Sequence, residues 1–74
     1  MKITWEKDDI KPGLRVGKPE RAEQWMVGYH QPPSSPVEYC LISLTDGLIS
    51  VRGTQNGIAA HLNETGDIPV ALFQ

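Results

Sequence analysis

The sequence predicts a mainly β fold with one short helix, arranged as a small barrel or a strongly twisted antiparallel sheet of about five strands. Short segments alternate apolar and polar residues, an Asp-Gly pair separates two apolar runs, and one segment combines helix caps with helical spacing. With 74 residues, the chain has room for one β-rich α+β domain that spans residues 1–74.

The segment 38–54 carries the strongest local signal, that of a β-hairpin. Asp46-Gly47 favours a two-residue type I′ turn, in which both central residues need a positive φ. This turn sets a register of directly opposed residues, which share a face of the sheet. The predicted pairs are Thr45 with Leu48, Leu44 with Ile49, Ile42 with Val51, and Cys40 with Gly53.

This register separates an apolar face from a mixed face. The residues of the apolar face, expected to be core, are Cys40, Ile42, Leu44, Ile49 and Val51. The residues of the mixed face, expected to make any functional contact, are Tyr39, Leu41, Ser43, Thr45, Leu48, Ser50, Arg52 and Thr54.

Before the hairpin, the chain reads as short extended segments. Residues 1–10 are expected to form an N-terminal strand or arm, and residues 14–16 a strand after a Pro-Gly turn. For residues 19–27, a helix that starts at Pro19 is an alternative to a loop followed by a strand. The loop and strand are favoured because Trp25, Val27 and Tyr29 alternate. The proline-rich residues 31–37 are a loop.

After the hairpin, residues 57–65 are expected to form a short helix. Thr54 or Asn56 can cap its start, Ile58 and Leu62 share one side, and Gly66 can end it. Residues 67–73 then predict a last strand, at an edge of the sheet or beginning only at Val70, because Pro69 lacks an N–H for a ladder.

The order of these elements resembles that of SH3-like small β-barrels, and the chain is similar in type to the short orphan proteins carried on mobile bacterial gene cassettes. The segments that carry the resemblance are 14–16, 25–29, 39–44 and 70–72. The acidic-aromatic cluster and tryptophan pair of peptide-binding SH3 domains are missing from the sequence, so recognition of proline-rich peptides is not implied. Small plasmid-borne dihydrofolate reductases resemble such barrels and build a site between subunits, but their Val-Gln-Ile-Tyr run has no counterpart here.

Composition disfavours two classes of partner. Seven basic and nine acidic residues give a net charge of −2 with the signs interleaved, whereas a nucleic-acid binder needs a basic face. No signal peptide or membrane-spanning run is recognisable, so neither secretion nor a membrane partner is expected. The single cysteine favours a cytoplasmic location.

No residue pattern indicates catalysis, a metal site or a cofactor. His30, His61 and Cys40 lie too far apart in the sequence to match a zinc motif, and none has a recognisable catalytic neighbour. His61 and Cys40 are therefore interpreted as structural residues, and His30 as an exposed one.

A non-enzymatic, self-associating protein-interaction module is the favoured function. A chain this short buries only about 60% of its unfolded surface, so a homo-oligomer is the expected source of further stability. The alternative is a small-molecule-binding protein or enzyme with its site at a subunit interface. Candidate contact residues are the large aromatic, apolar and basic ones near the hairpin: Trp25, Tyr29, Tyr39, Leu41, Leu48 and Arg52.

Overall fold

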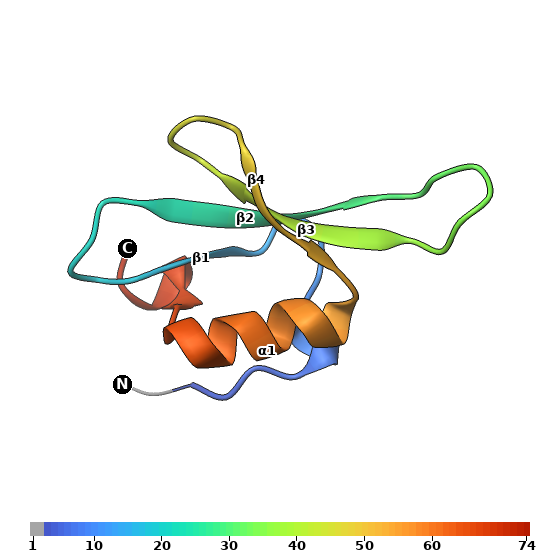
Figure 1. Ribbon diagram of the computed structural model, residues 1–74. Helices are drawn as coiled ribbons and strands as arrows, with labels where there is room; N and C mark the ends of the chain where they lie inside the picture. Colours follow the sequence, from blue (N-terminus) through green and yellow to red (C-terminus); the bar gives the residue numbers. More distant parts are fainter. Residues whose placement is uncertain (1–2) are drawn as a thin grey trace.

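The computed structural model describes residues 3–74, which form one open antiparallel sheet with an α-helix against one face (Figure 1). The strands are β1 (Arg15–Gly17), β2 (Gln24–His30), β3 (Glu38–Ser43), β4 (Ile49–Gly53) and β5 (Ile68–Pro69), in the spatial order β4-β3-β2-β1-β5. The helical segments are α1 (Gln55–Thr65) and two short 3-10 helices, η1 (Lys7–Asp9) and η2 (Val70–Leu72). The predicted mainly β class with one short helix is confirmed.

The ends of α1 follow from its capping residues. Thr54 is extended, and its Oγ1 accepts a hydrogen bond from the Gly57 N–H at 3.0 Å, which satisfies one of the free donors of the first turn. Gly66 takes a left-handed conformation with φ 82° and ends the helix with an N–H bond to the Leu62 carbonyl. The helix begins two residues before the predicted range 57–65, and it buries Ile58 and Leu62 completely, as their spacing predicted.

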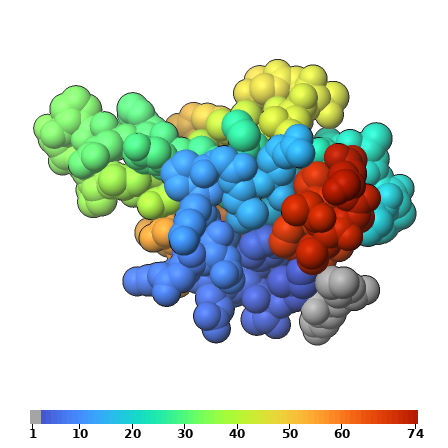
Figure 2. Space-filling view, turned by 180° about the vertical axis from the view of Figure 1, so that it is seen from behind, coloured from blue at the N-terminus to red at the C-terminus, as the bar shows by residue number. Residues whose placement is uncertain are grey.

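Residues 19–30 follow the favoured interpretation, a loop and then a strand. In β2, Trp25, Val27 and Tyr29 point to one face and pair with Ser43, Leu41 and Tyr39 of β3. The proline-rich residues 31–37 connect the two strands and project beyond the sheet as an arm (Figure 2).

The prediction of a two-residue type I′ turn at Asp46-Gly47 is wrong. A type I′ turn needs a positive φ at Asp46, but within residues 3–74 only glycines have one, and here it is Gly47 with φ 76°. Residues 44–47 form the loop instead, closed by a bond from the Ser43 N–H to the Leu48 carbonyl at 2.9 Å. Asp46 stabilises this wider loop because its Oδ1 accepts from the Leu48 N–H at 2.9 Å.

The predicted register and its two faces are therefore also wrong. Ile42 pairs with Ile49 and Leu41 with Val51, so Ser50 is the extra residue of a β-bulge. Leu41 and Ser43, assigned to the mixed face, are buried toward α1. Of the residues expected in the core, only Val51 packs there, since the bulge turns it inward. The uninterrupted apolar run 40–42 has no alternation that could select the buried face.

The two ends of the chain also differ from prediction. The predicted strand over 67–73 is only the two residues of β5 at the sheet edge, and Val70 starts a 3-10 helix that buries its own side chain. Residues 3–6 are not paired in the sheet but lie along α1 (Figure 1). Residues 1–2, the start of the predicted N-terminal strand or arm 1–10, lie outside the described residues.

The core lies between α1 and the sheet face beneath it. Its buried cluster comprises Trp5, Ile10, Val16, Val27, Leu41, Ile58, Ala59 and Leu62. Trp5 holds the N-terminal segment in place because its backbone exchanges two hydrogen bonds with the Asn63 amide, and its indole Nε1 donates to the Asp67 carbonyl at 2.8 Å. No helix among residues 3–74 has the length and apolar character that would let it cross a bilayer.

Candidate functional site

The sheet face opposite α1 is the first candidate surface, because no element of residues 3–74 packs over it (Figure 1). The strand registers place Met26, Ile42 and Ile49 in one row across β2, β3 and β4. A second row holds Gly28, Cys40 and Arg52. We call the apolar set Met26, Cys40, Ile42 and Ile49 the uncovered patch.

Gly28 lets this patch pack flat against the sheet. A Cβ on Gly28 would lie 2.9 Å from Ile42 Cδ1 and 3.4 Å from Cys40 Sγ, so both side chains lean over the glycine. Cys40 is a free thiol, and this packing buries it although it lies on the face opposite the core cluster. The exposed part of the patch is therefore formed by Ile49 and the partly buried Met26 and Ile42.

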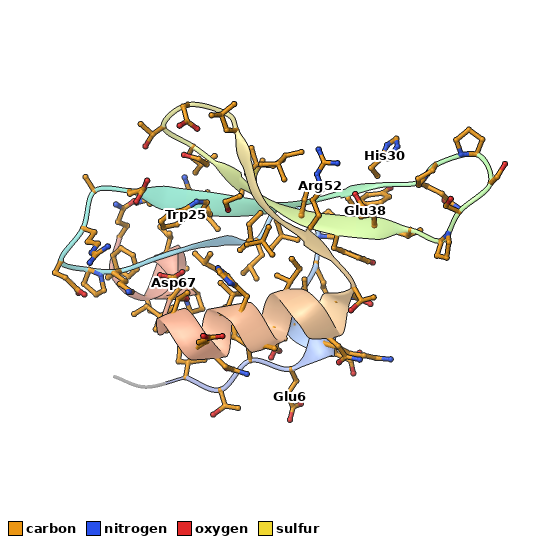
Figure 3. The ribbon with its side chains drawn as sticks, in the orientation of Figure 1. Glu6, Trp25, His30, Glu38, Arg52 and Asp67 are labelled. Atoms are coloured by element: carbon orange, nitrogen blue, oxygen red, sulfur yellow. The ribbon has the colours of Figure 1, made fainter. Side chains whose placement is uncertain are left out.

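Charged residues of both signs border the uncovered patch. Arg15 pairs with Met26 on β1, and Arg52 lies beside Cys40 on β4. The Arg52 Nη1 atom is 3.9 Å from the Glu38 carboxylate, and both side chains are largely exposed. Figure 3 shows Arg52 and His30 on the side of the sheet opposite α1. This exposed pair adds little stability but gives the border a positive and a negative group.

The structure does not bring all the predicted contact residues together. Tyr29 and Tyr39 form a tilted pair near the arm, with ring centroids 6.2 Å apart, on the same face as Val27. Leu48 is exposed beside the β3–β4 loop. Arg52 points away from this aromatic pair, to the uncovered face. Trp25 and Leu41 meet elsewhere, in a cavity on the helix side of the sheet.

That cavity, of about 240 Å³, is the second candidate surface. Apolar side chains of three strands form its floor: Trp25 of β2, Leu41 of β3 and Val51 of β4. Polar residues from α1 and the segment after it form one wall: His61, Thr65 and Asp67. Charged residues of the β1–β2 connection form its rim: Lys18, Arg21 and Glu23.

Sequence reasoning missed Asp67, Thr65 and the rim residues as site residues, and it interpreted His61 as structural. No motif links these positions, because helix, loop and sheet converge on the cavity only in the folded chain. Most of them lie in loops or at the ends of elements, where residues of functional sites often gather, but His61 lies within α1.

The described part of the chain contains neither a cluster of metal ligands nor an exposed nucleophilic cysteine. Across residues 3–74, no three His, Cys, Asp or Glu side chains lie close enough to hold a metal ion together. The thiol of Cys40 is buried between Gly28 and Ile42, whereas a nucleophilic cysteine needs an exposed, positively charged setting.

No family model matches the chain, and comparison with curated proteins and solved structures finds no significant similarity. The fold therefore defines the protein only as a small β-rich α+β protein with an open five-stranded sheet. The resemblance to SH3-like barrels stays a prediction.

Proposed function

We propose that the protein is a self-associating interaction module that dimerises face to face through the uncovered patch. The observation that carries the proposal is that residues 3–74 cover only one face of the sheet, and that the other face has apolar residues with a charged border. A sheet layer gains most stability when each of its apolar surfaces packs against another layer. A second copy of the same sheet would supply that layer.

The composition of the uncovered face supports a protein contact. An apolar centre inside a polar rim is the usual anatomy of protein–protein interfaces. Ile49, at the β4 end of the patch, leaves 45% of its surface exposed, and Leu48 beside it leaves 67%. Both signs of charge occur at the border, so a two-fold contact can set Arg15 or Arg52 of one copy near Glu38 of the other.

The edges of the sheet support a face contact over edge-to-edge pairing. At one edge, β5 is two residues long and contains Pro69, which has no N–H to donate. At the other edge, the bulge at Ser50 interrupts the regular ladder of β4. Short and bulged edges discourage the addition of a strand, which leaves the face as the larger contact surface.

Two charge substitutions at similarly exposed apolar residues test the proposal. Ile49→Glu places a carboxylate within the uncovered patch, whereas Leu72→Glu, the matched control, places it on η2, which lies on the side of α1 (Figure 1). Sedimentation equilibrium at micromolar concentration should show a dimer for the unchanged protein and Leu72→Glu, and a folded monomer for Ile49→Glu. An unchanged protein that stays at 8.2 kDa at all concentrations would contradict the proposal.

The proposal includes the predicted cytoplasmic location. A dimer that buries Cys40 beneath its interface is compatible with a reducing compartment, since the chain has no second thiol for an internal disulfide.

A further inference from the structure

The cavity between α1 and the sheet has features that self-association does not use. It lies on the opposite side of the sheet from the uncovered patch, and its floor of Trp25, Leu41 and Val51 is apolar. At about 240 Å³ it exceeds the roughly 150 Å³ apolar cavity that holds benzene in an engineered protein. Small-molecule sites combine such a floor with a few convergent polar groups.

Asp67 is the polar group that distinguishes this cavity from a packing gap. Its residue surface is only 6% exposed, although it carries a carboxylate. Two contacts fix its position: Oδ2 accepts from the Thr65 hydroxyl at 3.0 Å, and the backbone carbonyl accepts from Trp5 Nε1. Figure 3 shows Asp67 and Trp25 where β1 and β2 lie over the C-terminal half of α1.

One oxygen of this carboxylate is available to a ligand. Among the hydrogen bonds of residues 3–74, none ends on Asp67 Oδ1. The described chain has no fully buried side-chain oxygen without a partner, so Oδ1 retains some accessible surface, and Asp67 is among the residues that line the cavity. Lys18 and Arg21 line the same cavity, yet neither forms an ion pair with Asp67. A buried carboxylate in this setting favours a positively charged or N–H donor.

We propose that this cavity binds a small amino-substituted aromatic ring system, with its N–H donors on Asp67 and its ring against Trp25, Leu41 and Val51. The apolar floor suits a planar ring, and Trp25 supplies an aromatic surface for stacking. The cavity volume fits one or two fused rings. His61 and Thr65 of α1 also line the cavity, and the Thr65 hydroxyl bonds to Asp67, so these polar side chains would orient the donor edge of the ring.

Two probes of equal shape test the ligand class on the full chain. The first is 2-aminobenzimidazole, and the second is 2-methylbenzimidazole, in which a methyl group replaces the amino donors. Titration followed by amide chemical shifts in NMR should show at least about tenfold tighter binding of the amino probe. The shifted resonances should come from Trp25, Leu41, Val51, His61 and Thr65.

Asp67→Asn tests the role of the carboxylate, with Glu64→Gln as the control that removes one charge from an exposed neighbouring position. Asp67→Asn should remove the preference for the amino probe by weakening its binding more than that of the methyl probe, which has only the ring N–H to donate, whereas Glu64→Gln should alter neither. Equal affinities for the two probes on the unchanged protein, shifts clustered elsewhere, or no binding at millimolar concentration would each overturn the proposal. The probe comparison decides the question even where Asp67→Asn fails to fold, and it is independent of the oligomeric state.

Discussion

The same strands form both faces of the sheet, but the side chains of the two faces differ in burial. On the covered face, Val27 and Leu41 are within 2% of complete burial against α1. On the opposite face, their strand neighbours Met26 and Ile42 are only half-buried, although they are as apolar. The described chain has one α-helix, so it can cover only one face. The comparison shows that residue type alone does not define the core; the position of α1 does.

The largest expected difference is between Leu41→Ala and Ile42→Ala, neighbours on opposite faces of β3. Leu41→Ala opens a cavity in the core and should lower the free energy of unfolding by about 3 kcal/mol. Ile42→Ala truncates a partly buried side chain outside the core cluster and should cost the monomer roughly 1 kcal/mol. Urea unfolding at a concentration too low for association measures both. Equal losses of unfolding free energy in the two variants would mean that the uncovered face stabilises the monomer as much as the covered face does.

A smaller effect is expected from Asn63→Ala, which acts on the covered side. The Asn63 side chain exchanges two hydrogen bonds with the backbone of Trp5, so its loss frees the N-terminal segment from α1. Thermal unfolding should show a loss of about 1 kcal/mol, because each such bond contributes roughly that amount and alanine recovers some helix propensity. Glu64→Ala, on the next and exposed residue, should change stability by less than about 0.5 kcal/mol. If the two variants unfold alike, the Trp5 contact does not stabilise the fold.

The smallest effect is expected at the border of the uncovered face. Arg52→Ala removes the exposed pair with Glu38, whose atoms are 3.9 Å apart, and should change monomer stability by at most about 0.5 kcal/mol. A double-mutant cycle with Glu38→Ala measures the coupling directly. A coupling above 1 kcal/mol would mean that the border is part of the stable fold and not only of a contact surface.

Local signals in the sequence were sufficient to predict β2 and the end of α1, and they located the start of α1 to within two residues. Thr54 and Gly66 bound α1 through their own hydrogen bonds and φ angle, and the alternation from Trp25 to Tyr29 fits β2. These features depend on interactions between residues close together in the chain, so they can be predicted from the sequence alone.

The orientation of β3 and the cavity could not be predicted in this way. In the run Cys40-Leu41-Ile42 either face can be buried, and the choice depends on α1 and on the bulge at Ser50. The cavity joins Trp25 to Asp67, which are far apart in the chain and share no motif. The buried face of β3 and the lining of the cavity both depend on how distant segments pack, which local sequence patterns do not encode.

If the uncovered patch joins two copies of the chain, its methyl groups must contact one another between copies, and an isotope-filtered NOE experiment detects such contacts. A mixture of labelled and unlabelled protein reports only contacts between different copies. We expect intermolecular NOEs that connect the methyl groups of Met26, Ile42 and Ile49 across the interface. Intermolecular NOEs that instead involve Leu72 and the side of α1, or none at a concentration where the protein sediments as a dimer, would contradict it.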